Sequence, residues 1–498
     1  MRLTKTNVQW LGLILGPLCA IMAYPLLPET YQDSEGVSVM FSHAGRATAV
    51  LAVWIAIWWM TEAISIYATA LLPLAVLPMT GAMPIRQAAS PYASELVYLF
   101  MGGFILALAM QRWGLHRRFA LSALRLVGTQ PRRLIGGFMG VTAILSMWVS
   151  NTATTIMMLP IALSVVELVK NKEAGQPDSN DNFTPCLLLA IAYAASIGGV
   201  GTLIGTPPNL FLASYIKDNL DQEISFVRWM GVGVPLVAVF LPLVWLFMTR
   251  VIFPISSPGI EVKDPITAEA YQDLGPMSRG EWAVLFVFLA TVFAWIFRPL
   301  LLQIEIAGVR PLGGMTDSGI AIMAALALFV IPVDIKDRVF VIDWGTAKQL
   351  PWEVLVLFGG GLSLAAAIRV NGVGEYLGNQ VGSLAGIPDM LLVVIVITMV
   401  IYLTELTSNT ATTATMVPIL AGLASGLGFH PFTLIVPAAI AASLAFMLPV
   451  ATPPNAIVFG SGYVTMQQMI RAGLWLNISG IIIITVLLYT VMAWVLAI

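Results

Sequence analysis

The sequence predicts an all-α polytopic membrane protein built from two repeats of inverted orientation. Composition is the first reason: 58% of the 498 residues are hydrophobic and only 10% are charged, whereas soluble proteins carry about a quarter charged residues. An internal repeat is the second reason, because Ser150-Asn151-Thr152-Ala153-Thr154-Thr155 recurs as Ser408-Asn409-Thr410-Ala411-Thr412-Thr413. Such a repeat indicates a duplicated structural unit within one membrane-embedded chain.

The repeat extends well beyond these two stretches. The same shift of 258 residues aligns Gly102 with Gly360 and Gly114 with Gly372. A third pair of motifs, Thr206-Pro207-Pro208-Asn209 and Thr452-Pro453-Pro454-Asn455, is 246 residues apart. The three pairs occur in the same order, so we infer that the whole core is duplicated.

Eleven helices are expected to cross the membrane, because each crossing needs about 20 predominantly apolar residues. The uninterrupted ones are expected near residues 8–28, 45–61, 64–82, 93–112, 229–253, 282–302, 317–333, 352–371 and 474–497. Two further helices, 184–216 and 433–462, contain the Pro-Pro motifs and are expected to be broken. The Arg-rich segment 113–130 and the Gly-rich segment 372–388 are expected to lie along the membrane surface.

Residues 131–170 and 389–427 are interpreted as two re-entrant hairpins whose tips are the Ser-Asn-Thr stretches. They could instead be ordinary kinked crossings, and the distribution of charge separates the two topologies. With two re-entrant hairpins, 17 of the 24 Lys and Arg residues fall on the side of the N-terminus and seven on the other. The positive-inside rule then places the N-terminus in the cytoplasm, with one hairpin entering from each side.

The two tips are predicted to bind an anion and cations. A hairpin tip leaves the last carbonyls of one arm and the first amides of the next without partners. The carbonyl end attracts a cation and the amide end an anion, and irregular backbone at membrane depth is tolerated where it lines a cavity. Two tips suit a ligand with two anionic ends. The alternative is that the small polar residues only pack the hairpins closely.

Other classes of function find little support. The net charge of −2 indicates no nucleic-acid partner, and Cys19 and Cys186 lie in apolar runs that suggest no disulfide framework. An enzyme is not expected, since no His or Lys lies near Ser150 in sequence to act as a base. Glu62 and Glu405 are the acids most expected at membrane depth. Each is either a functional group or an ordinary interfacial acid, and Glu405 could support a cation site at the second tip.

These motifs, together with two flanking segments, resemble the divalent anion:sodium symporter family over nearly the whole chain. The flanking segments are Trp58-Trp59-Met60-Thr61-Glu62-Ala63 and Ala70-Leu71-Leu72-Pro73-Leu74. The resemblance implies a bacterial inner-membrane homodimer of eleven helices, with a scaffold domain and a transport domain that moves like an elevator through the lipid bilayer. It implies cotransport of Na⁺ with a C4-dicarboxylate such as succinate, malate or fumarate.

The resemblance also implies roles for individual residues. A first sodium site would use Ser146, Ser150, Asn151 and Gly199, and a second would use Thr404, Thr407, Asn409 and Ala451. The substrate carboxylates would contact Ser150, Asn151, Thr152, Ser408, Asn409 and Thr410, with Thr452 and Pro453 completing the pocket. Thr152 and Thr410 are both present, which favours a dicarboxylate over citrate. Because the family contains sodium-independent exchangers, exchange is an alternative to symport.

Transport of an inorganic dianion such as sulfate is a second alternative, and a passive channel is a third.

The chain is expected to divide into five parts. They are scaffold helices of the first half in 1–112, the first hairpin and broken helix (transport domain) in 113–216, connecting and scaffold helices in 217–371, the second hairpin and broken helix (transport domain) in 372–462, and a C-terminal helix in 463–498.

Overall fold

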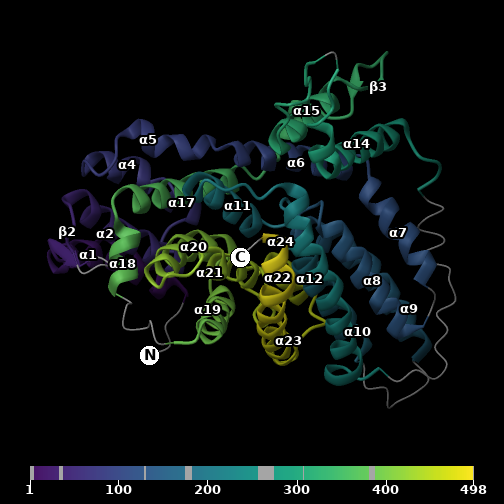
Figure 1. Cartoon of the computed structure of the whole chain (residues 1–498). Helices are drawn as coiled ribbons and strands as arrows, with labels where there is room; N and C mark the ends of the chain where they lie inside the picture. The colour runs from purple at the N-terminus through teal and green to yellow at the C-terminus, as the bar shows by residue number, and fades with distance from the viewer. Residues whose placement is uncertain are drawn as a thin grey trace.

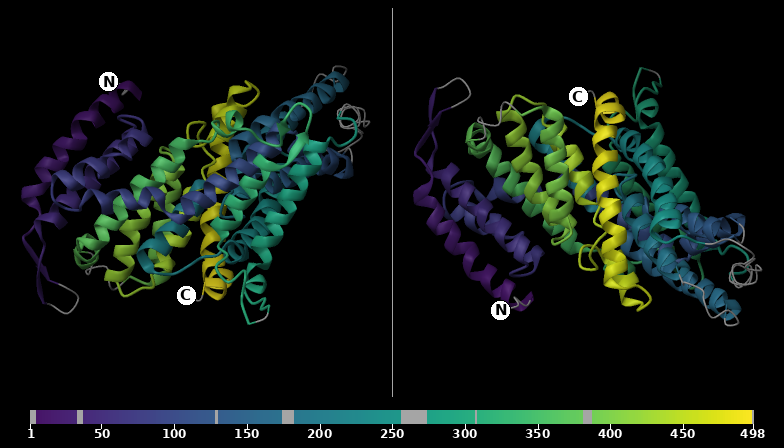
Figure 2. Two further views of the ribbon diagram at one scale, coloured as in Figure 1. Left: turned by 90° about the horizontal axis from the view of Figure 1, so that it is seen from above. Right: turned by 90° about the horizontal axis from the view of Figure 1, so that it is seen from below.

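The computed structural model describes residues 5–32, 37–127, 130–173, 182–255, 274–306, 308–380 and 387–496. These residues are mainly helical, as predicted. The N-terminal helices lie at one end of an elongated molecule and residues 131–173 lie toward the other end, with the C-terminal helices between them (Figures 1 and 2).

The elements of the first half include one short two-stranded sheet. In chain order they are α1 (Lys5–Ala23), η1 (Tyr24–Leu26), β1 (Thr30–Gln32), β2 (Ser38–Met40), α2 (His43–Thr61), α3 (Ile66–Thr69), α4 (Leu72–Met79), α5 (Ile85–Ala89), η2 (Ser90–Ala93), α6 (Glu95–Arg112), α7 (Leu115–Val127), α8 (Pro131–Ser146), α9 (Asn151–Glu173), α10 (Phe183–Gly199) and α11 (Pro207–Leu220).

The second half follows the same plan and adds a C-terminal helix. Its elements are α12 (Phe226–Phe247), η3 (Met248–Ile252), α14 (Arg279–Leu301), α15 (Asp317–Val330), β3 (Pro332–Asp334), β4 (Val339–Phe340), α16 (Trp344–Ala347), α17 (Trp352–Val370), α18 (Val373–Gln380), α19 (Asp389–Thr404), α20 (Asn409–Gly426), α21 (Phe432–Ala442), α22 (Pro453–Gly460), α23 (Met466–Leu487), η5 (Leu488–Met492) and α24 (Ala493–Leu496).

The chain is not purely helical, because two antiparallel hairpins, β1–β2 and β3–β4, occur in the loops. The strands are two or three residues long, and the sequence analysis did not anticipate them. The expected helix 317–333 ends at Val330 since Pro332, which has no N–H, follows and begins β3. Tyr31 of β1 is buried and packs into the helical core.

The expected helix 64–82 is interrupted between α3 and α4, close to Pro73. The hydroxyl group of Tyr92 donates a hydrogen bond of 2.5 Å to the carbonyl of Ala70 at this break. Gly360 of α17 packs against the same turn, where a Cβ on Gly360 would lie 2.2 Å from the carbonyl oxygen of Ala70. The break therefore allows the two backbones to approach closely.

The structure has both predicted pairs of helix breaks. Residues 147–150 separate α8 from α9, and residues 405–408 separate α19 from α20. Residues 200–206 separate α10 from α11, and residues 443–452 separate α21 from α22. In each unit the hairpin and the broken helix pack against one another, α8 and α9 with α10, and α19 and α20 with α21.

Seven helical segments among the described residues are long and apolar enough to cross a membrane: Asn7–Leu26, His43–Thr61, Ile85–Arg112, Phe226–Ile252, Arg279–Leu301, Trp352–Val370 and Met466–Leu496. The four other expected crossings, 64–82, 184–216, 317–333 and 433–462, correspond to shorter or interrupted helices. The total of eleven and the re-entrant course of the hairpins remain predictions.

Candidate functional site

The first tip brings three oxygen atoms together behind the start of α9. The Oγ atom of Ser146 lies 2.6 Å from Oδ1 of Asn151 and 2.8 Å from the carbonyl oxygen of Ala195. A serine hydroxyl has only one hydrogen to donate. The cluster therefore has more lone pairs than donors, and such a cluster suits a hard cation, which prefers oxygen ligands.

The second tip repeats this arrangement with different residues. The Oγ1 atom of Thr404 lies 2.7 Å from Oδ1 of Asn409 and 2.8 Å from the carbonyl oxygen of Ala442. Ser146 and Thr404 are both buried, each with no exposed surface. The duplication has therefore preserved the hydroxyl–amide–carbonyl cluster as well as the Ser-Asn-Thr stretch.

Gly199 lies directly against the first cluster. A Cβ atom on Gly199 would be 2.5 Å from Oδ1 of Asn151, which is closer than van der Waals contact allows. Only glycine therefore permits Asn151 to occupy this position. The repeat equivalent of Gly199 is Ala445, since Nδ2 of Asn209 donates to the Gly199 carbonyl and Nδ2 of Asn455 donates to the Ala445 carbonyl, each at 3.1 Å.

The asparagine of each Thr-Pro-Pro-Asn motif stabilises a broken helix. Nδ2 of Asn209 also lies 3.3 Å from the carbonyl of Val200 and 2.8 Å from that of Thr202. Nδ2 of Asn455 donates likewise to the carbonyl of Leu448 at 3.1 Å. A helix end leaves carbonyls without backbone partners, and these amides satisfy some of them. The sequence analysis identified the motifs but missed this role of the asparagines.

A cavity of about 860 Å³ lies between the two tips and the two broken helices. It reaches from the tips to the C-terminal ends of α2 and α6 and the N-terminal end of α17, where Gln349 and Glu353 are exposed to solvent. Among the described residues that line it, none is Lys or Arg. At the tips an anion would therefore meet neutral donors and helix ends, whereas the opposite wall carries the carboxylates of Glu62 and Glu353.

Most of the residues predicted from the sequence line this cavity. They are Ser150, Asn151, Thr152, Thr407, Ser408, Asn409, Thr410, Ala451, Thr452 and Pro453. Ser146, Gly199 and Thr404 are not among the lining residues and lie behind the tips. The first repeat contributes Thr206 and Pro207 in the same way as the second contributes Thr452 and Pro453. The repeat relationship alone could have identified that pair.

The opposite wall of the cavity comes from residues outside the hairpins, and the sequence analysis anticipated only Glu62 among its polar members. Glu62 ends α2 with a left-handed backbone conformation (φ 48°). The other polar members are Thr61, Tyr67, Gln111, Gln349 and Glu353. No local pattern marks these residues, because their helices meet the tips only in the folded molecule.

Thr407 uses its hydroxyl group within the second hairpin. Its Oγ1 atom lies 2.9 Å from the carbonyl of Leu403 and 2.6 Å from Oγ1 of Thr412. The hydroxyl group of Thr407 therefore joins the end of α19 to the first turn of α20.

Glu405 lies outside the cavity and stabilises the second broken helix. Its carboxylate is 3% exposed and accepts hydrogen bonds from the backbone amides of Phe446, Met447 and Leu448 at 2.7–3.1 Å. The first repeat has Met147 at the equivalent position. The two repeats therefore differ in charge directly beside their tips.

Comparison with protein families identifies the family of this chain. A model described as the sodium:sulfate symporter transmembrane region matches residues 17–498. The chain belongs to the divalent anion:sodium symporter family. Members of this family are transporters and not enzymes, and the chain is an integral membrane protein.

Curated members of the divalent anion:sodium symporter family match almost the full chain. One is the sodium-dependent dicarboxylate transporter SdcS of Staphylococcus saprophyticus, 41% identical over 489 residues that cover 97% of this chain and 91% of the relative. Another is SdcS of a bovine strain of Staphylococcus aureus, 42% identical over 494 residues that cover 98% and 92%.

Two solved structures share the fold at low sequence identity. The YdaH transporter of Alcanivorax borkumensis has a TM-score of 0.57 at 14% identity and covers 98% of each chain. MtrF of Neisseria gonorrhoeae has the same TM-score at 13% identity and covers 97% of each chain. These likenesses concern the fold alone.

Proposed function

We propose that this member of the divalent anion:sodium symporter family carries a C4-dicarboxylate, such as succinate, malate or fumarate, together with Na⁺. The observation that supports this most directly is the pair of oxygen clusters behind two tips whose neutral donors line one shared cavity. The names of the relatives, which are sodium-dependent dicarboxylate transporters, support the same substrate and ion.

The oxygen clusters are the proposed cation sites. Ser146, Ser150, Asn151 and Gly199 would hold one sodium ion, and Thr404, Thr407, Asn409 and Ala451 would hold the other. The Oδ1 atoms of Asn151 and Asn409 both belong to clusters with a surplus of acceptors. A sodium ion would replace the missing donor in each cluster, so ion binding would order both tips.

The dicarboxylate would bind between the two tips. α9 and α20 begin at Asn151 and Asn409, and a helix N-terminus presents free amides and a partial positive charge to an anion. Each carboxylate would meet one tip, with Thr152 and Thr410 donating from their hydroxyl groups. Since the described residues of the cavity wall include no Lys or Arg, the nearby sodium ions would supply the positive charge that couples the two substrates.

Transport would proceed by alternating access, with the tips moving as part of a transport domain in an elevator mechanism. The predicted topology has the N-terminus and the cavity mouth at Gln349 and Glu353 on the cytoplasmic side of the bacterial inner membrane. In that frame the described conformer faces inward. A homodimer would provide a fixed scaffold against which the transport domain moves.

Two alternatives use the same cavity. A sodium-independent exchanger would need the carboxylate contacts but not the oxygen clusters. A carrier of sulfate, the anion in the description of the family model, would bind one compact dianion in place of two separated carboxylates.

Uptake of labelled succinate into proteoliposomes tests the proposal. The vesicles contain no dicarboxylate, and the inward gradient is of sodium or of choline. Uptake only with sodium is the expected result. Uptake that requires preloading with dicarboxylate and does not depend on sodium would establish exchange. Sodium-driven uptake of sulfate, with no uptake of succinate, would establish the inorganic substrate.

A further inference from the structure

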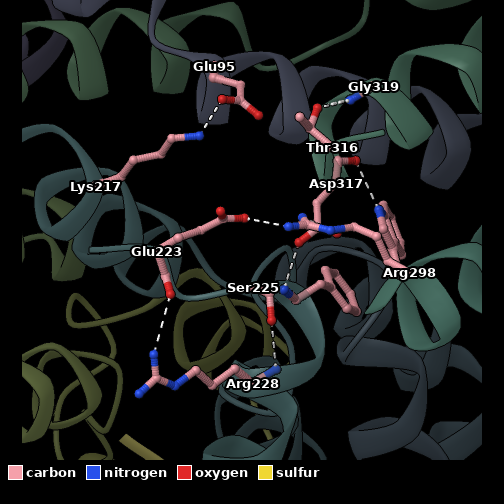
Figure 3. A network of polar contacts seen from close by, with 11 residues as sticks. Glu95, Lys217, Glu223, Ser225, Arg228, Arg298, Thr316, Asp317 and Gly319 are labelled. Atoms are coloured by element: carbon pink, nitrogen blue, oxygen red, sulfur yellow. Dashed lines mark hydrogen bonds and ion pairs between the residues drawn. The ribbon is translucent and has the colours of Figure 1, made fainter. Parts of the chain in front are cut away.

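Figure 3 shows a network of ion pairs and hydrogen bonds around Glu95. Glu95 begins α6, whereas the cavity mouth lies at the opposite end of this helix, beside Gln111. The network surrounds the corner between α11 and α12. Lys217, in the last turn of α11, pairs with Glu95 in the first turn of α6. Next to it, Oγ of Ser94 donates a hydrogen bond of 3.0 Å to the carboxylate of Asp218.

A second part of the network joins the start of α12 to α14 and α15. The carboxylate of Asp317 accepts a hydrogen bond of 2.8 Å from the backbone amide of Phe226. Arg298 of α14 lies 2.9 Å from Asp317 and 2.8 Å from Glu223 in the loop between α11 and α12. Trp295 stacks on Phe226 with 4.2 Å between ring centroids.

The network lies where two groups of helices meet. α6, α14 and α15 pack against one another, α11 packs mainly on α20, α17 and α21, and α12 packs mainly on α8 and α10. Direct packing between the groups is smaller and joins α11 to α6 and α12 to α14. α11 and α12 therefore each contact elements of the two broken hairpin units, α20 and α21 in one case and α8 and α10 in the other. α11 begins at the site and reaches Lys217 about 15 Å farther along its axis.

The internal repeat does not preserve the Lys217–Glu95 pair among the described residues. The shift of 258 residues relates Glu95 to Glu353, which begins the equivalent helix and lies exposed at the cavity mouth. The shift of 246 residues relates Lys217 to Tyr463. An ion pair equivalent to Lys217–Glu95 therefore cannot form at the mouth when the cavity closes there and opens at the other end.

From this asymmetry we infer that Lys217–Glu95, Asp218–Ser94 and the Asp317–Arg298–Glu223 contacts form a one-sided latch. The latch stabilises the conformer whose cavity opens at Glu353, and its contacts must break before the α11–α12 corner can separate from α6, α14 and α15. The inference rests on the proposed alternating-access transport. It adds a group of residues that determine the relative populations of the two conformers.

Chemical labelling of a cysteine at the closed end tests the latch without any substrate. Ala213 of α11 has no exposed surface and lies beside Glu95 and Lys217. The reporter protein carries Ala213→Cys and Cys19→Ala, and it retains Cys186, which is fully buried in α10. Mass spectrometry then follows the labelling rate of each cysteine by a thiol reagent in detergent.

Glu95→Gln and Lys217→Gln should each increase the labelling rate at Ala213→Cys about fivefold, because that rate follows the population of the minor conformer. The labelling rate of the double variant should be only slightly higher than that of either single variant, since both substitutions remove the same ion pair. Cys186 should remain as slow as before. Glu305→Gln, which removes an exposed ion pair of 3.7 Å with Arg310, is the matched control and should change neither rate.

An unchanged rate at Ala213→Cys in both single variants would overturn the latch. A parallel increase at Cys186 would also overturn it, since that result means general loosening of the fold. If wild-type vesicles fail to take up succinate while the labelling rates change as expected, the proposed substrate is wrong and the latch stands. If uptake is sodium-driven and the labelling rates do not change, the latch alone is wrong.

Discussion

Oε1 of Glu405 lies 2.8 Å from Nδ2 of Asn477, which joins the second hairpin to α23. The same carboxylate accepts backbone hydrogen bonds from the break between α21 and α22. One buried side chain therefore connects three elements around the second tip. A buried carboxylate is costly unless its acceptors are fully used, and here four donors share its two oxygens.

We expect Glu405→Gln to destabilise the protein by about 2–4 kcal/mol, because the amide offers one acceptor and turns its NH₂ group toward backbone donors. Thermal unfolding in detergent measures this effect. Glu375→Gln is the control, since Glu375 is exposed and accepts a long hydrogen bond of 3.3 Å from Tyr31. Equal midpoint temperatures of thermal unfolding for Glu405→Gln and Glu375→Gln would contradict the role assigned to Glu405.

Asn151→Ala and Asn409→Ala should each reduce sodium-driven uptake at least about tenfold and leave the folded protein intact. Each substitution removes the Oδ1 atom that the neighbouring hydroxyl contacts. The loss of a side chain that contacts an ion lowers the affinity for that ion by more than about tenfold. Ser425→Ala, at the far end of α20, should transport normally. Wild-type uptake by either asparagine variant would show that the clusters do not bind the ions.

Two threonines of α20 have different predicted roles, one as a substrate contact and the other as a structural contact. Thr410 lines the cavity, whereas Thr413 is buried and donates a hydrogen bond of 2.8 Å to the carbonyl of Asn409. Thr410→Val should raise the apparent KM for succinate about tenfold, because a hydrogen bond to a carboxylate is lost. Thr413→Val should leave that KM unchanged. Equal KM values for the two variants would place Thr410 away from the substrate.

The sequence predicted the elements of the site better than its surroundings. The helix breaks follow from local chemistry, since proline and glycine interrupt helices and the Ser-Asn-Thr and Thr-Pro-Pro-Asn motifs occur twice. The wall containing Gln111 and Glu353 could not be predicted, because it forms through contacts between residues far apart in the chain. The same holds for Glu405 and Asn477, whose partners are 41 to 72 residues away.

Gly199 allows the most direct test of the first cation cluster. Gly199→Ala adds one methyl group that would lie 2.5 Å from Oδ1 of Asn151, so Asn151 must move away from Ser146. We expect sodium-driven uptake to require about tenfold more sodium, measured as the sodium concentration for half-maximal rate, because the cluster loses its geometry. Gly140→Ala is the matched control, since its Cβ meets no atom within 4 Å and should leave sodium dependence unchanged. An unaltered sodium requirement in Gly199→Ala would mean that the ion binds elsewhere, and the surplus of oxygen acceptors at Ser146 would then need a partner other than sodium.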